Sequence, residues 1–202
     1  MTTLQHTQPE THKPRLERSG VNRIMQVLVS IVIAGLILFL TAGRIDWPAA
    51  WIFLGTYTVA VLTIGVLTAR KHPDVINERG KIARNAQSWD KVLITCYTVL
   101  LFVVFGVAGF DAGRFGWSTM SPLVQVAGYV SFLLATAVTY WAMAVNPFLA
   151  TIVRIQDDRG HYVITTGPYR YVRHPMYATM FLMWPGVALE LGSWASSCAA
   201  LT

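Results

Sequence analysis

Four long uncharged runs constrain this chain more than any other feature of its sequence. Ile24–Gly43, Trp47–Ala69, Val92–Phe110 and Phe115–Val153 contain no Asp, Glu, Lys or Arg over 20, 23, 19 and 39 residues. A helix of about 20 apolar residues crosses a bilayer, and it satisfies its own backbone hydrogen bonds there. Only 13% of the 202 residues are charged, against about a quarter in a soluble domain. The sequence therefore predicts an all-α integral membrane protein with four full transmembrane helices.

A fifth hydrophobic segment begins at Met176 and predicts a C-terminal helix or a hairpin. It is interrupted by Glu190 and by the pair Gly192-Ser193. Residues 1–21 are polar and contain two prolines, so we expect a disordered cytoplasmic tail, followed by a single transmembrane domain over 22–202. We expect helices at about 22–43, 47–69, 91–110, 122–148 and 176–191, with a partial helix at 194–202.

The basic residues alternate between the two sides of the predicted spans. Fourteen precede the first span or lie in the loops after the second and fourth spans, whereas only Arg44 and Arg114 lie in the other two loops. The positive-inside rule then places the N-terminus and the 150–175 loop in the cytoplasm. We therefore expect a multi-pass protein of a bacterial inner membrane. Because the charges follow the topology, they do not indicate a nucleic-acid partner.

The stretch Gly167–Tyr177, with the sequence GPYRYVRHPMY, concentrates polar and aromatic groups between two apolar segments. Gly167-Pro168 predicts a turn, and Pro175 suits the first position of a helix. The guanidinium of Arg173 could bind a carboxylate, and His174 could bind a hydroxyl or act as an acid or base. The alternative is an interface belt, in which arginines reach lipid phosphates and tyrosines lie at the headgroups.

The tyrosines of this stretch, Tyr169, Tyr171 and Tyr177, offer ring faces to an adenine or to a sulfonium cation. Asn146 ends the fourth span. A lone asparagine in a span usually bonds to a neighbouring helix, but here it could also orient a polar group of a substrate. No Cys/His spacing predicts a metal site.

Two further loops mix charged and aromatic residues. His72–Gly80 predicts a short amphipathic helix; we favour a solvated connector, with a lid or a substrate-docking surface as the alternative. Phe110–Trp117 predicts a structural turn, in which Asp111 and Arg114 could pair.

The string GPYRYVRHPMY resembles the signature of the isoprenylcysteine carboxyl methyltransferase and phospholipid methyltransferase group of membrane enzymes. Asn146-Pro147-Phe148, Val153–Ile164 and Phe110–Trp117 also resemble its bacterial members, so that the resemblance covers most of residues 45–195. Its most specific part is the Arg-His-Pro-x-Tyr core at 173–177.

The resemblance implies a site for S-adenosylmethionine (AdoMet) at the cytoplasmic face. It also implies methyl transfer, by direct in-line displacement, to a lipid-soluble or membrane-embedded acceptor such as a lipophilic small molecule or a lipidated group. Arg173 and Asn146 are the predicted catalytic residues. The residues implied at the cofactor site are Gly167, Tyr169, Arg173, His174, Pro175 and Tyr177.

One departure from the family pattern affects the expected activity. The family has a return helix and a pair of glutamates after this segment, whereas only about nine residues follow Gly192-Ser193 here. Nine helical residues rise about 14 Å, which is less than the roughly 30 Å of a hydrocarbon core. We therefore expect that a partner or a second copy completes the site, or that the chain is an inactive truncated membrane protein. A third alternative is an NADPH-dependent membrane sterol or steroid reductase, because those enzymes carry a similar Arg-His-Pro-x-Tyr element.

Overall fold

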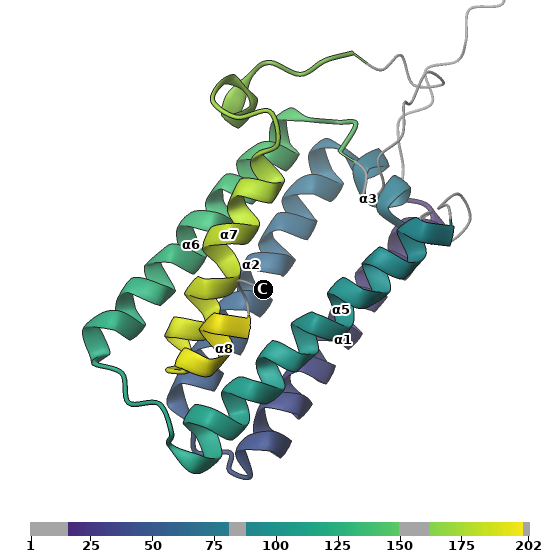
Figure 1. Ribbon diagram of the computed structural model, residues 1–202. Coiled ribbons are helices and arrows are strands. Elements are labelled where there is room, and N and C mark those ends of the chain that lie inside the picture. Colours follow the sequence, from purple (N-terminus) through teal and green to yellow (C-terminus); the bar gives the residue numbers. More distant parts are fainter. Residues whose placement is uncertain (1–15, 81–87, 150–161, 200–202) are drawn as a thin grey trace, which may run out of the picture.

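The computed structural model describes residues 16–80, 88–149 and 162–199, and every regular element in these ranges is helical (Figure 1). This confirms the predicted all-α class. In chain order the elements are α1 (Arg18–Ala42), α2 (Pro48–Lys71), α3 (Pro73–Gly80), α5 (Ser88–Ala108), the π-helical turn η1 (Gly109–Phe115), α6 (Pro122–Val145), the 3₁₀ turn η3 (Gly167–Arg170), α7 (Pro175–Glu190) and α8 (Trp194–Ala199).

Four helices are long and apolar enough to cross a membrane: α1, α2, the helix formed by α5 with η1, and α6. Their outward faces carry large apolar side chains, such as Leu40 at 73% exposure and Leu123 at 79%. An apolar exterior of this extent is unfavourable in water and favourable in lipid. The protein is therefore a multi-pass membrane protein.

Prolines and glycines set several helix ends where the sequence predicts them. Pro48 and Pro122 occupy the first turns of α2 and α6, where the missing proline N–H has no intrahelical partner to lose. Gly43 ends α1 in the left-handed region, with φ 66°, and its N–H donates to Phe39 O at 2.9 Å. Helix α6 ends at Val145, three residues before the predicted end, because Asn146 precedes Pro147 and adopts an extended conformation.

Helix α1 begins at Arg18, one turn earlier than predicted. The additional turn packs against α3: the side chain of Asn77 is buried and its Oδ1 accepts a hydrogen bond from the N–H of Glu17 at 2.9 Å. Gly80 lies directly against the backbone of Ser19, and Gly20 lies against Asn77. Tertiary contact therefore extends α1 into a stretch that composition alone predicts to be disordered.

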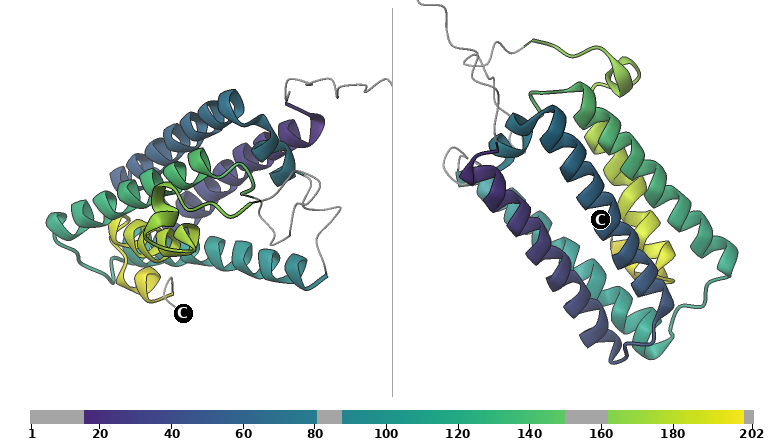
Figure 2. Two further views of the ribbon diagram at one scale, coloured as in Figure 1. Left: turned by 90° about the horizontal axis from the view of Figure 1, so that it is seen from above. Right: turned by 180° about the vertical axis from the view of Figure 1, so that it is seen from behind.

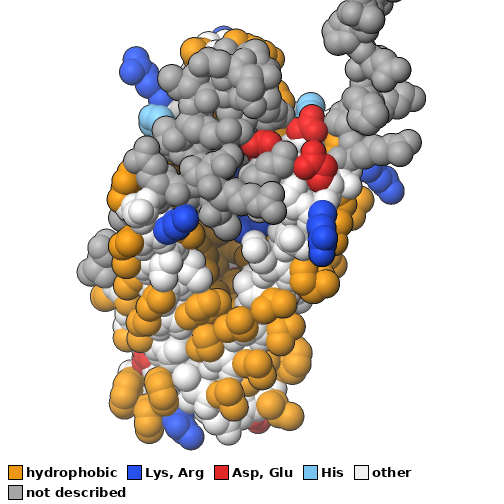
Figure 3. All heavy atoms as spheres, turned by 90° about the vertical axis from the view of Figure 1, so that its right-hand side faces the viewer, with side chains coloured by type: hydrophobic (Ala, Val, Ile, Leu, Met, Phe, Trp, Pro, Cys, Tyr) orange, Lys and Arg blue, Asp and Glu red, His pale blue; other side chains and the backbone are white. Residues whose placement is uncertain are grey.

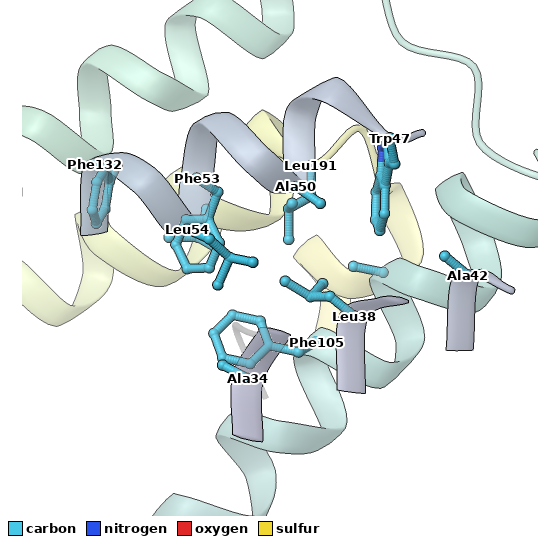
Figure 4. Packing of buried hydrophobic residues seen from close by; sticks show 12 residues of the cluster. Ala34, Leu38, Ala42, Trp47, Ala50, Phe53, Leu54, Phe105, Phe132 and Leu191 are labelled. Carbon is cyan, nitrogen blue, oxygen red and sulfur yellow. The ribbon is translucent and has the colours of Figure 1, made fainter. Parts of the chain in front are cut away.

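An aromatic cluster fills the centre of the bundle (Figure 4). Phe53 of α2 lies 5.5 Å from the ring of Phe105 and 5.9 Å from the ring of Phe132, and Leu38 and Leu191 are buried beside this cluster. These residues come from α1, α2, α5, α6 and the end of α7, so one core joins all the spanning helices.

Helices α6 and α7 run antiparallel and side by side along their length (Figures 1 and 2). Gly128 and Gly186 form the contact: a Cβ on Gly128 would lie 2.7 Å from Gly186 O, and a Cβ on Gly186 would lie 2.9 Å from Gly128 O. Small residues at such a crossing let two backbones approach closely. This packing fixes the C-terminal end of α6 next to the N-terminal end of α7, and the 167–177 loop lies at these two helix ends.

The C-terminal end of α5 does not form the predicted turn. The π-helical η1 continues α5, and the predicted pair between Asp111 and Arg114 is wrong. Buried Asp111 instead accepts hydrogen bonds from the hydroxyls of Ser118 at 2.6 Å and Ser193 at 2.5 Å, whereas the guanidinium of Arg114 lies 5.9 Å from the ring centre of Phe110. Asp111 thereby ties the end of α5 to the turn before α8, a structural role as predicted.

Candidate functional site

The 167–177 loop is held tightly against the end of α6. Gly167 opens the loop with φ +60°, and a Cβ there would lie 3.0 Å from Val145 and 3.1 Å from the indole nitrogen of Trp141. Pro168 is buried in the 3₁₀ turn that follows. Pro175 is buried at the first position of α7, as the sequence predicts. The backbone of the loop is therefore fixed at both ends, by a glycine and by prolines.

Asn146 and Tyr169 are the predicted site residues that the structure joins directly. The side-chain amide of Asn146 donates to the hydroxyl of Tyr169 at 2.8 Å, and its carbonyl oxygen accepts from the N–H of Phe148 at 2.9 Å. Burial raises the pKa of the Tyr169 hydroxyl, while the hydrogen bond from Asn146 and the charge of Arg79 act in the opposite direction. Asn146 therefore positions Tyr169, and its predicted catalytic role stays a prediction.

Three other predicted residues lie on the exposed side of the loop. Tyr177 is 55% exposed, and its ring centre lies 5.6 Å from that of the exposed His174. Arg173 is also exposed, and among the described residues it has no hydrogen bond or ion pair. The structure thus separates the predicted residues into an inner pair, Asn146 and Tyr169, and an exposed group, Arg173, His174 and Tyr177.

A residue that was not predicted, Arg79, lies next to the inner pair. Helix α3 is not a solvated connector: Val75, Ile76 and Asn77 are buried as it packs against α1 and α2 (Figure 1). This packing directs Arg79 toward α6, where its Nη1 lies 3.9 Å from the sulfur of Met143. The segment that the sequence presents as a connector therefore brings a cation into the bundle.

Arg79 lacks the hydrogen-bond and ion-pair partners, among the described residues, that usually stabilise a buried guanidinium. Its Nε is buried and has no hydrogen-bond partner, and the structure shows no ion pair between its guanidinium and a described carboxylate. Burial and, next, the nearby charge of Arg23 lower the pKa of Arg79 to about 10, with Tyr169 acting in the opposite direction. A pKa near 10 leaves the guanidinium charged at neutral pH. Arg79 is thus a partly buried cation beside Tyr169.

Helical spacing in the sequence contains a signal for Arg79. Residues 75 and 79 are four apart, so that they share one face of a helix. Val75 and Ile76 mark the apolar face of the 73–80 segment, and Arg79 falls on the same side. A cation on the apolar face of a short helix is the pattern that could have identified it.

The interior beyond the two arginines is apolar. Arg23 interacts electrostatically with Tyr57 as well as with Arg79. Tyr57 lines a small hollow of about 20 Å³, whose other walls are almost entirely apolar. These walls are formed by Ser30, Ala34, Phe53, Leu101, Phe102, Phe105, Phe132, Met183, Trp184 and Val187. The site therefore changes from cationic near α3 to apolar at the centre of the bundle.

One face of the molecule is recessed. Figure 3 shows a hollow in the face turned toward the viewer, with Lys or Arg side chains beside it and inside it, and hydrophobic side chains below. A recess with a basic upper part and an apolar lower part is suited to a molecule with a polar head and an apolar body.

Comparison with known proteins supplies the family. Neither the curated proteins nor the solved structures gave a match. The family model described as phospholipid methyltransferase matches residues 123–202, which include α6, the 167–177 loop, α7 and α8. Helices α1 to α3, with Arg23 and Arg79, precede the matched part. This match agrees with the resemblance of the sequence, and the matched family suggests methyl transfer on a membrane-embedded acceptor.

Proposed function

We propose that the protein transfers a methyl group from AdoMet to a lipid-soluble acceptor at the cytoplasmic face of a bacterial inner membrane. The observation that carries this proposal is the family match over α6, the 167–177 loop and α7. The hydrogen bond between Asn146 and Tyr169 supports it, because it fixes a polar group at the point where the helices meet the loop.

The exposed residues of the loop fit AdoMet chemically. AdoMet carries a carboxylate, an adenine and a sulfonium. The planar donors of Arg173 match a carboxylate, and no described group competes for them. His174 and Tyr177 present accessible rings 5.6 Å apart, which suit an adenine or a cation. These three side chains would hold AdoMet, with the backbone from Gly167 to Pro175 as a fixed support.

The protein would contribute mainly alignment and exclusion of water. When bound, AdoMet supplies an electrophilic methyl group on its sulfonium. Tyr169 is held in one orientation by Asn146 and could fix a polar atom of the acceptor. The apolar walls below would keep water from the reacting atoms, and fixed geometry of this kind is the main route by which a protein can accelerate a displacement.

The charge distribution supports the proposed orientation. The end of the bundle that carries the loop holds Arg18 at the start of α1, Arg70 and Lys71 at the end of α2, and Arg173 just before α7. Arg44, which follows α1, lies at the opposite end. Labelling of single cysteines in intact cells and in inverted vesicles would test this orientation. Labelling of a cysteine at position 170 only in inverted vesicles is expected, and labelling in intact cells would contradict it.

AdoMet binding to the purified protein in detergent tests the proposed function. We expect calorimetric binding of AdoMet and none of NADPH. We also expect that Arg173→Ala weakens AdoMet binding at least about tenfold, since a charge-assisted bidentate contact is lost, and that Arg170→Ala, a neighbouring exposed arginine, serves as the matched control. Binding of NADPH instead of AdoMet would refute the proposal. Equal AdoMet affinity of the two variants would remove Arg173 from the cofactor site.

A further inference from the structure

We infer that the groove between α1 and α2 holds one acyl chain of a bound phospholipid, with the lipid phosphate on Arg44 at the end of the bundle opposite the 167–177 loop. The inference is independent of the proposed methyl transfer, because both helices precede the family-matched residues 123–202. Figure 2, right, shows α1 (purple) and α2 (blue) joined at that end by the short turn that carries Arg44.

The groove has the volume of a ligand site and the length of one lipid leaflet. Its volume is about 1120 Å³, next to roughly 300–1,000 Å³ for sites that hold small molecules. On α1 it extends from Ile31 to Gly43, which at about 1.5 Å per residue is about 18 Å of helix. Half of a hydrocarbon core is about 15 Å thick. One acyl chain would therefore lie along the groove while its head group reaches the membrane surface.

Two glycines keep the groove open between larger side chains. A Cβ on Gly55 would meet no described atom within 4 Å, and a Cβ on Gly35 would meet the side chain of Leu54 at 3.4 Å. Leu40 and Trp51 also line the groove, and they are 73% and 56% exposed. Helices that pack together in a membrane present small residues to each other. Large projecting side chains beside glycines suit a thin, flexible chain better than a second helix of about 10 Å diameter.

The mouth of the groove carries a guanidinium with donors to spare. Arg44 donates from Nε to Asp46 Oδ1 at 3.0 Å and from Nη2 to Asp46 O at 2.8 Å, and no described group accepts from its Nη1. A second cation, Arg114, lies at the same end, since a Cβ on Gly43 would lie 3.1 Å from its Nη2. Guanidinium groups bind phosphate oxygens through strong hydrogen bonds. A phospholipid supplies that phosphate at the point where its acyl chains begin.

The mouth is also held in one conformation by contacts within the chain. The indole of Trp51 donates to Ile45 O at 2.7 Å, and its ring centre lies 4.7 Å from that of Phe39. Tryptophan is enriched at the membrane–water interface, where lipid head groups lie. Because these contacts exist without a ligand, binding of a lipid would cost little ordering of the protein.

The test compares wild type and four variants of the full chain, purified in a mild detergent. Gly55→Trp places a large ring in the groove. Gly65→Trp is its matched control, because position 65 is also an open position on α2 but lies outside the groove. Arg44→Gln removes the proposed phosphate contact, and Arg70→Gln, at the other end of α2, is its control. Native mass spectrometry measures the retained lipid and the number of copies, and thermal unfolding measures the effect of added lipid.

We expect wild type to retain a phospholipid through purification. After the lipid is removed, dioleoyl phosphatidylglycerol and phosphatidylcholine should each raise its unfolding temperature by about 5–11 °C at a hundredfold excess over the dissociation constant. Dioleoylglycerol, which has the chains without the phosphate, should bind about tenfold more weakly or worse. Inorganic phosphate should not change the unfolding temperature.

The variants should separate the two parts of the site. Gly55→Trp should retain no lipid and should lose the thermal shift. Arg44→Gln should bind phospholipid no better than dioleoylglycerol. Gly65→Trp and Arg70→Gln should both retain lipid as wild type does.

Three outcomes would overturn the inference. The first is equal lipid retention by Gly55→Trp and Gly65→Trp, and the second is equal affinity of wild type for phospholipid and dioleoylglycerol. The third is a wild-type dimer without lipid that Gly55→Trp converts to a monomer, which would assign the groove to a second copy of the chain. If Gly55→Trp does not fold, Arg44→Gln and Arg70→Gln decide, because equal phospholipid affinity of these two variants would remove Arg44 from the site.

Discussion

The contact between Gly128 and α7 gives the sharpest prediction about stability. A Cβ at position 128 would lie 2.6 Å from the amide nitrogen of Glu190 and 2.7 Å from both Gly186 O and Leu189 Cβ, whereas ordinary contacts begin at 3.4 Å. Two of these three atoms belong to the backbone and cannot turn aside. Gly128→Ala must therefore push α6 and α7 apart by roughly 0.7 Å at their tightest point.

Two opposing effects set the magnitude for Gly128→Ala. Overpacking of a close contact costs about 1–3 kcal/mol, and replacing glycine by alanine within a helix gains about 1 kcal/mol. Gly65→Ala in α2 is the matched control, since nothing lies within 4 Å of its new Cβ and only the helix-propensity gain remains. The difference between the two variants isolates the cost of overpacking.

Thermal unfolding in detergent, followed by circular dichroism, measures this difference. With about 2–4 °C per kcal/mol for a protein of this size, Gly128→Ala should unfold about 2–12 °C below Gly65→Ala. Gly186→Ala should be intermediate, because its Cβ would meet its nearest atoms at 2.9–3.1 Å. Equal unfolding temperatures for Gly128→Ala and Gly65→Ala would show that α6 and α7 do not meet at these glycines.

Two further predictions concern polar groups. Asp111→Asn should lower the free energy of unfolding by about 2–4 kcal/mol, because the carboxylate accepts hydrogen bonds from two serine hydroxyls at 2.5 and 2.6 Å. The control Asp46→Asn, in an exposed ion pair, should lower the free energy of unfolding by less than about 1 kcal/mol when both are measured by chemical denaturation in detergent. Tyr169→Phe removes the acceptor of the 2.8 Å bond from Asn146 and should lower methyl transfer severalfold without unfolding the protein, whereas Tyr171→Phe, 75% exposed, should leave the rate unchanged. Equal rates for the two tyrosine variants would remove Tyr169 from the site.

The membrane fold was predictable because its signals are local. A run of about 20 uncharged residues and a proline at a helix start each depend on a few neighbours in the chain, and the helices begin and end within a few residues of their predicted positions. The exceptions have tertiary causes. Helix α1 gains a turn because α3 packs against Gly20, and Asp111 pairs with Ser193, which lies 82 residues away.

The residues of the candidate site also differ in whether the local sequence or the tertiary packing reveals them. The motif identified Arg173, which the structure leaves exposed, whereas Arg79 lies 90 residues before the Tyr169 hydroxyl that it approaches. Neither a motif nor a charge count separates Arg79 from the other basic residues of the 70–91 loop. Its place on the apolar face of the 73–80 helix is the sequence signal for its burial. Of the two arginines, Arg79 is the one whose charge is unfavourable for stability in the folded protein. Arg79→Met should therefore unfold at the same temperature as wild type or higher, because it removes a buried charge that has no described partner. Arg173→Ala should leave the unfolding temperature unchanged, because the Arg173 side chain is exposed.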